Sequence, residues 1–265
     1  MNKCGVLVCR LANLSVKKIF RLYQLFRYLV GIIIGVIIFL YVRTTISTGY
    51  SSYTLVLTII LWFFVGVTIG NRRLFSNVLD YILLENVDFE KYNSYHAYAS
   101  NKISGKNSFM MDFSSGIKEF LKGNFDEALP YFEKCNVNQL SFLDKKRVLR
   151  VKNFFEKLLF LHQGRKLEDF PKIKQEKQSM KNNEYTIFLF EVEKVLNGKT
   201  TNYFGEKNSP SHLILIMKLY YQALSFFNAN DKSAAKEKFQ QIANENPELF
   251  YVREAKKYLE ELDNE

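Results

Sequence analysis

The fold is decided by two apolar stretches near the start of the chain, LFRYLVGIIIGVIIFLYV (Leu25–Val42) and YTLVLTIILWFFVGVTIG (Tyr53–Gly70), joined by a polar link at residues 43–52. Each stretch has 18 residues. At a rise of about 1.5 Å per residue, a helix of this length is about 27 Å long. This length nearly matches the hydrocarbon core of a bilayer, which is about 30 Å thick. The two stretches therefore predict a hairpin of transmembrane helices.

The positive charge of the chain is concentrated around this hairpin. Residues 1–70 contain seven Lys and Arg and no Asp or Glu, whereas the remaining residues contain 30 basic and 27 acidic side chains. Five cations precede the first apolar stretch, Arg27 lies at its start, and Arg72 and Arg73 follow the second stretch. Because Lys and Arg collect on the cytoplasmic side, we expect a two-span protein of the cell membrane with both termini in the cytoplasm. The nearly neutral remainder argues against nucleic-acid binding.

Residues 1–24 form a basic arm that we expect to lie in the cytoplasm. Overlapping its end, residues 14–27 place apolar side chains, among them Ile19 and Phe26, on one side of a helix and cations on the other. Such a helix either lies in the headgroup layer, where anionic lipid attracts its cations, or leads directly into the first span. Both alternatives make membrane lipid a partner of the arm and hairpin.

Residues 25–70 form the predicted two-helix transmembrane hairpin, and each span contains two glycines one helical turn apart. These are Gly31 and Gly35 in the first span and Gly66 and Gly70 in the second. Small residues at this spacing allow close approach of transmembrane helices. In an antiparallel hairpin both pairs lie toward the cytoplasmic side, which favours packing of one pair against the other. The alternative is that they reflect only the frequency of glycine in membrane helices.

We expect residues 71–265 to form one cytoplasmic helical domain, in which two distant stretches share a pattern. Each has a small residue twelve positions before an alanine and an aromatic residue four positions after that alanine. These residues are Gly116, Ala128 and Phe132 in the first stretch and Ala223, Ala235 and Phe239 in the second. Small residues allow two antiparallel helices to cross closely, and the aromatic ring fills the space beside them.

On these residues the chain resembles the tetratricopeptide repeat family. The segment FDEAL at 125–129 is similar to the start of the family's second helix, and Pro247 stands where the family ends a repeat. Asp112 and Leu219 occupy positions where the family often has Trp. The resemblance implies an all-α fold, with the transmembrane helical hairpin followed by a tetratricopeptide-like (TPR-like) α-solenoid. It also implies binding of a protein partner and no common catalytic residues.

In such repeats the first helix of each unit lines the concave surface. The matched positions assign seven apolar residues to a candidate partner groove: Met110, Phe113, Ile117, Phe120, Tyr220, Leu224 and Phe227. If exposed, they would suit an apolar helix laid into a groove. The alternative, which we favour, is that the middle helices, above all residues 141–163, cover them and make them core.

The sequence contains no recognisable catalytic or metal-binding pattern. His96, His162 and His212 are far apart, and none has a partner at the spacing of a zinc-binding helix. A nucleophile elbow and a phosphate-binding loop are both missing. The three cysteines match no zinc spacing. We therefore expect no enzyme activity, cofactor, metal or small-molecule substrate.

These patterns predict a membrane-anchored adaptor that binds or organises a protein partner at the cytoplasmic face. A rival hypothesis is an accessory or self-protection subunit of a membrane transporter, with its specificity in the hairpin. A weaker one is a membrane enzyme of unknown reaction.

Overall fold

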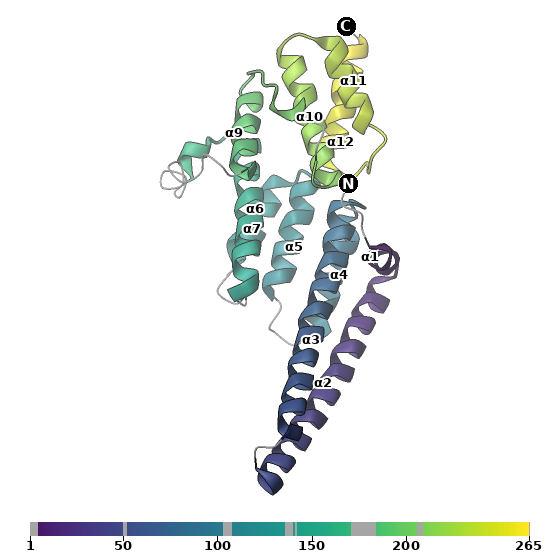
Figure 1. Ribbon diagram of the computed structural model, residues 1–265. Helices are drawn as coiled ribbons and strands as arrows, with labels where there is room; N and C mark the ends of the chain where they lie inside the picture. Colours follow the sequence, from purple (N-terminus) through teal and green to yellow (C-terminus); the bar gives the residue numbers. More distant parts are fainter. Residues whose placement is uncertain are drawn as a thin grey trace. The chain divides into compact units, whose positions relative to one another are not determined.

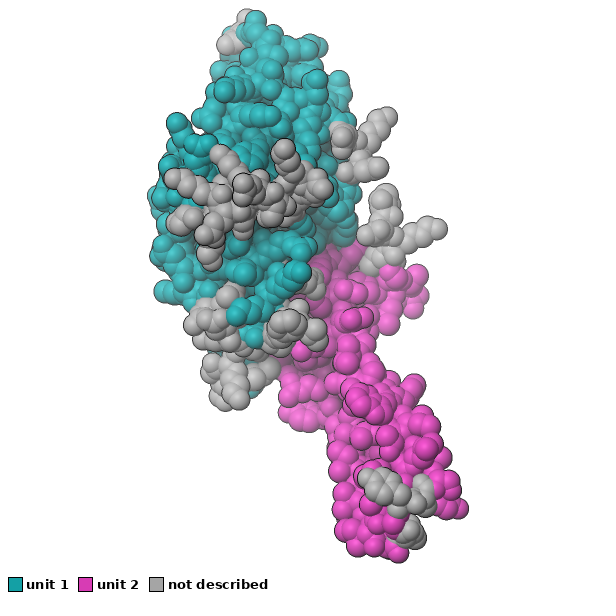
Figure 2. Space-filling view, turned by 60° about the vertical axis from the view of Figure 1, so that its left-hand side comes forward, with its two compact units in different colours: residues 1–2, 84–265 teal, residues 3–83 magenta. Residues whose placement is uncertain are grey.

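The chain is helical throughout the part that the structure describes. Its residues form helices joined by turns, with no strand among the described positions (Figure 1). The predicted all-α class is therefore confirmed. Contacts divide the chain into two compact units, Lys3–Leu83 and Leu84–Glu265 (Figure 2). The computed structural model describes residues 5–49, 52–102, 108–135, 140, 142–170, 184–205 and 209–264.

The first unit contains a short helix, α1 (Val6–Ala12), and two long antiparallel helices, α2 (Val16–Thr48) and α3 (Ser52–Leu84) (Figure 1). Each long helix has 33 residues, which corresponds to about 50 Å. Both are long and apolar enough to cross a membrane. Both also exceed the hydrocarbon core of about 30 Å, so each predicted span continues as helix beyond it.

The end of the basic arm, residues 1–24, belongs to a long helix. Helix α2 already begins at Val16 and continues without interruption into the first span. The helix is uninterrupted because residues 16–27 contain no Gly or Pro to end it. On its apolar side Ile19 is buried, whereas Leu22 and Phe26 are 40% and 41% exposed, so the location of this side in the headgroup layer stays a prediction.

The second span likewise continues past its predicted end. Helix α3 extends through Arg72 to Leu84, so residues 71–83 belong to the hairpin unit and not to the helical domain. The rings of Tyr23 on α2 and Phe75 on α3 lie 5.1 Å apart. This contact joins the two helices beyond the predicted spans.

The second unit is built largely from helix pairs. Helices α5 and α6 pack together, as do α10 and α11, while α4 packs on α5 and α12 on α11. The two pairs lie where the repeated pattern predicted them. The helices are α4 (Phe89–Lys102), α5 (Ser108–Leu121), α6 (Phe125–Lys134), α7 (Phe142–His162), α9 (Glu184–Leu196), α10 (His212–Asn228), α11 (Lys232–Ile242) and α12 (Phe250–Asn264), with short 3-10 turns η2 (Leu167–Asp169) and η3 (Tyr203–Gly205).

The tight turns within the pairs have a clear local origin. Gly123 and Asn230 take left-handed conformations, with φ of 75° and 59°, directly after α5 and α10, as residues that end helices often do. The Asp231 carboxylate accepts a hydrogen bond of 3.1 Å from the Ala234 amide and caps α11. At Gly116, an added methyl group would lie 2.9 Å from the Phe132 ring. The small residue is therefore required where α5 and α6 cross.

The last helix contacts the first helix pair. The rings of Phe250 on α12 and Phe125 on α6 have centroids 5.2 Å apart, and a methyl group added at Gly123 would lie 2.6 Å from Phe250. In an open solenoid each repeat contacts only its neighbours. The predicted solenoid arrangement is therefore not confirmed.

Candidate functional site

The seven residues of the predicted partner groove do not form an open surface. Met110 and Phe227 are half-buried. The other five are at most 6% exposed: Phe113, Ile117, Phe120, Tyr220 and Leu224. The prediction that these positions line a groove for a partner helix needs correction, because they form part of the core. Burial within the chain removes their apolar surface from water and leaves no patch of the kind that marks a binding site.

Two helices outside the matched pairs cover these residues. The Phe120 ring contacts Phe155 of α7 with centroids 5.2 Å apart, which agrees with the favoured alternative that the segment around 141–163 fills the groove. The Tyr220 ring lies 5.3 Å from that of Tyr251 on α12. Phe120 and Tyr220 are thus each buried by a helix that is distant in sequence.

The four glycines of the hairpin are exposed. A methyl group added at Gly31, Gly35, Gly66 or Gly70 would meet no neighbouring atom within 4 Å. The structure therefore does not bring the two pairs together, and the predicted packing of one pair against the other needs correction. On α2, Val30 and Ile37 are buried instead, two turns apart on one face, and the glycines are left on outer surfaces of the helices.

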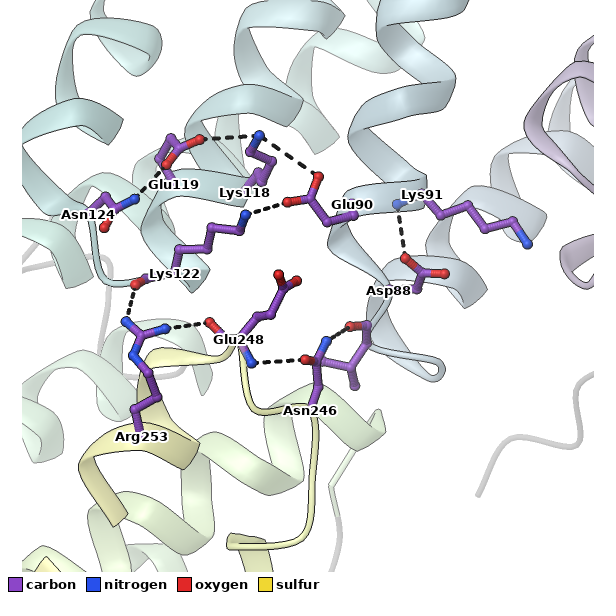
Figure 3. Close-up of polar contacts among 11 residues, drawn as sticks. Asp88, Glu90, Lys91, Lys118, Glu119, Lys122, Asn124, Asn246, Glu248 and Arg253 are labelled. Carbon is purple, nitrogen blue, oxygen red and sulfur yellow. Dashed lines mark hydrogen bonds and ion pairs between the residues drawn. The ribbon is translucent and has the colours of Figure 1, made fainter. Parts of the chain in front are cut away.

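A polar cluster joins α4 to the end of α5 (Figure 3). Glu90 forms an ion pair with Lys122 and a longer one, 3.8 Å, with Lys118, which also lies 3.4 Å from Glu119. The hydrogen bond to Glu90 raises the pKa of Lys122. Asp88 accepts a hydrogen bond of 2.9 Å from the Lys91 amide and caps α4.

The same cluster extends to the end of the chain (Figure 3). The Arg253 guanidinium donates to the Lys122 carbonyl and, at 2.7 Å, to the Glu248 carbonyl. The Asn246 side-chain amide donates to the Val87 carbonyl at 3.3 Å. The cluster therefore connects the first and last helices of the unit. Glu90, Lys118, Glu119 and Lys122 pair with one another, and the Arg253 guanidinium binds backbone carbonyls. Such an arrangement is typical of a structural link.

The most chemically distinctive group lies where α7, α10 and α12 meet. His162 Nε2 is 2.8 Å from the Tyr221 hydroxyl, which is 3.4 Å from that of Tyr251. The imidazole stacks on Phe125 at 4.8 Å. Burial lowers the pKa of His162 to about 4 and raises the pKa of both phenols. At neutral pH all three groups are uncharged, so this chain of polar atoms serves packing better than proton transfer.

A shallow cavity of about 520 Å³ adjoins His162 at the start of α6. Asp126 and Gln163 face each other at its edge, with a hydrogen bond of 2.9 Å between their side chains. The residues that line it are Gly123, Asn124, Phe125, Asp126, Glu127, His162 and Gln163. Sequence reasoning missed this site, because Asp126 and His162 are 36 positions apart and no motif links them.

The described residues contain no group of three or more His, Cys, Asp or Glu side chains able to hold a metal ion. Cys135 is buried, and burial raises the pKa of its thiol to about 12, so it is a poor nucleophile. His96 is buried against Tyr92 and Tyr95, and burial lowers its pKa to about 4.

Comparison with known proteins found no match among protein-family models, curated proteins or solved structures.

Proposed function

We propose that this protein is a membrane-anchored adaptor without catalytic activity. Two transmembrane helices hold it in the cell membrane, both termini lie in the cytoplasm, and the helical unit binds a protein partner there. The proposal combines the anchor, whose support is structural, with the partner binding implied by the TPR-like pattern of the helix pairs.

The observation that carries the anchor is the exposure of apolar side chains on α2 and α3. In the most apolar 18-residue stretch of each helix, only 11% of the residues on α2 and 6% of those on α3 are buried. Phe39, Trp62 and Phe63 are each at least 65% exposed. The core helix of a soluble protein buries such side chains, because exposed apolar surface costs about 25 cal/mol per Å² in water. In hydrocarbon the same surface is favourable.

The orientation is tested by cysteine labelling of intact cells. In a background with the native cysteines replaced, Ser47→Cys and Lys256→Cys place single thiols at exposed positions at the end of α2 and on α12. A membrane-impermeant maleimide is expected to modify Ser47→Cys at once and Lys256→Cys only after permeabilisation. Modification of Lys256→Cys in intact cells would overturn the cytoplasmic assignment. Release of the protein from membranes by alkaline carbonate would overturn the anchor itself.

The adaptor role is tested by exchange of the hairpin. Residues 5–83 are replaced by an unrelated two-span anchor, and partners are captured by crosslinking in native membranes. An adaptor keeps the same crosslinked partner, because recognition lies in the helical unit. Phe120→Ala, which removes a core side chain, provides the matched negative control and is expected to lose the partner.

One observation favours the transporter-subunit alternative. The exposed glycines leave room for close approach of a transmembrane helix from another protein. Gly31→Leu and Gly66→Leu fill this room without a clash inside the protein. Loss of the crosslinked partner in these variants, and in the hairpin exchange, would replace the adaptor with the transporter subunit.

A further inference from the structure

We propose that residues 85–88, which connect α3 to α4, form a conformational switch that the end of the chain holds in a strained state. In this state Val87 has a left-handed backbone, and the loop between α11 and α12 is bound to it. Release of the loop lets Val87 relax. The inference goes beyond the adaptor role and does not depend on it.

The backbone of Val87 is strained. Its φ is 52°, and Asn230 is the other non-glycine residue with a positive φ in the part of the chain that the structure describes. Asn tolerates this conformation, whereas a side chain branched at Cβ is an outlier there. The penalty for a left-handed residue other than glycine is equivalent to about 5- to 30-fold in an equilibrium constant. Such strain persists only where the surrounding structure imposes it.

The constraint on Val87 comes from outside the connection. Residues 85–88 read ENVD, so no Gly or Pro favours a bend there. The Val87 side chain is 2% exposed. Its carbonyl accepts a hydrogen bond of 3.3 Å from the side-chain amide of Asn246, 159 positions later in the chain (Figure 3). Burial and this bond therefore hold the left-handed conformation.

Asn246 is in turn positioned by α12. The Glu248 amide donates a hydrogen bond of 3.0 Å to Asn246 Oδ1. The Glu248 carbonyl accepts one of 2.7 Å from the guanidinium of Arg253 on α12, which also donates to the Lys122 carbonyl directly after α5. The loop therefore stays bound to Val87 while α12 is docked.

An ion pair closes this set of contacts at the start of α4. The Lys122 ammonium pairs with Glu90, which lies three positions after Val87 (Figure 3). The connection, the loop, α12, the end of α5 and the start of α4 thus form one ring of contacts. Coupling in such a ring is reciprocal. Undocking of α12 favours the relaxed form of Val87, and a lower cost of the left-handed conformation strengthens the docking of the loop.

The position of Val87 in the chain gives the switch its role. A return of its φ to negative values changes the direction of the chain between Leu84, the last residue of α3, and Phe89, the first residue of α4. The switch therefore links the docking of the last helix to the segment that directly follows the hairpin of α2 and α3.

Hydrogen–deuterium exchange of the full chain in detergent tests the switch. The amides of Lys91 and Tyr92 report on the connection, because they donate to the Asp88 carboxylate and carbonyl at 2.9 Å and 3.1 Å. The amide of Glu248 reports on the loop, because it donates to Asn246. Release of the loop is expected to speed up exchange at both places together.

The coupling is tested first by variants that leave Val87 unchanged. Loss of one hydrogen bond shifts a local equilibrium by about 2- to 12-fold, so Asn246→Ala is expected to speed up exchange at the connection by this factor. Arg253→Ala is expected to do the same, although Arg253 is bound to the loop and not to Val87. The matched control is Asn228→Ala, which removes hydrogen bonds of 2.8 Å and 3.1 Å to the carbonyls of Val195 and Lys199. It is expected to leave the connection unchanged.

The strain is tested by comparison of Val87→Gly with Val87→Ala. Both variants lose the buried side chain, but only alanine keeps the strain at positive φ. Exchange at the loop is therefore expected to be about threefold slower in Val87→Gly than in Val87→Ala. The control pair is Val192→Gly and Val192→Ala, at a buried position within α9. There the order is expected to reverse, with exchange in α9 about two- to fivefold faster for glycine.

Three results would overturn the proposal. They are unchanged exchange at the connection in Asn246→Ala or Arg253→Ala, an equal rise in Asn228→Ala, and slower exchange at the loop in Val87→Ala than in Val87→Gly. The variants at Asn246 and Arg253 keep the Val87 side chain, so they decide the coupling even if the variants at position 87 do not fold.

Discussion

Truncation of Phe120 provides the sharpest test of whether the predicted groove is core. The side chain is 1% exposed, and its ring lies 5.2 Å from Phe155 and 5.5 Å from Phe125. These neighbours make further ring contacts with Phe154 and Phe250, so they cannot easily collapse into the space that Phe120→Ala leaves. A truncation of this kind costs about 3–5 kcal/mol of unfolding free energy.

For a unit of this size, each kcal/mol lowers the melting temperature by about 2–4 °C. Phe120→Ala is therefore expected to melt roughly 6–20 °C lower than the wild type, measured by circular dichroism at 222 nm on the full chain in detergent. Tyr185→Ala is the matched control, because this aromatic ring is 42% exposed. Its cost is expected to stay below about 1 kcal/mol. A shift for Phe120→Ala no larger than that of the control would refute the burial of this surface.

Two other predictions concern the turn at Gly123 and the buried histidine His96. Gly123→Ala and Gly164→Ala both place an alanine at positive φ, 75° and 73°, but only the methyl group at position 123 meets a neighbour, Phe250 at 2.6 Å. Gly123→Ala is therefore expected to lose about 1–3 kcal/mol more stability than Gly164→Ala. Equal melting temperatures of the two variants would contradict the contact of α12 with the first helix pair. The pKa of His96 is about 4 in the folded protein and about 6.5 when unfolded. The unfolded chain therefore binds a proton at His96 that the folded chain does not. The contribution of His96 to stability is constant above about pH 6.5 and falls by up to roughly 3 kcal/mol as the pH drops toward 4. His96→Phe is expected to remove this part of the pH dependence, and an unchanged dependence in thermal melts would show that His96 is accessible.

Residues close in sequence were predicted well. Gly116 and Phe132 are 16 positions apart, and their spacing predicted the crossing of α5 and α6 because a short turn leaves two helices little choice but to pack side by side. The apolar stretches of α2 and α3 were equally clear, since uninterrupted hydrophobicity of this length is rare outside membrane helices. The start of α2 was not clear from the sequence, because an apolar and basic segment is compatible with either a surface helix or an extended span.

The candidate site depended on contacts between residues far apart in the chain. The stacking of His162 on Phe125 and the hydrogen bonds of Arg253 and Asn246 with Lys122 and Val87 have no local signal, because polar and aromatic residues at such separations pair only after several helices have packed. The outward orientation of the four hairpin glycines is a similar case. Spacing within a helix shows which residues share a face, but not which face the neighbouring helix covers.

By itself, then, the sequence determined the helical class, the hairpin with its flanking cations, and the two helix pairs, since each follows from the periodicity and charge of a continuous segment. Only the tertiary structure decided that α7 and α12 cover Phe120 and Tyr220, and that the four hairpin glycines face outward. The physical reason is the same in both cases. Burial and proximity across the chain depend on how helices dock, and docking is selected by the packing of the whole unit rather than by any one segment.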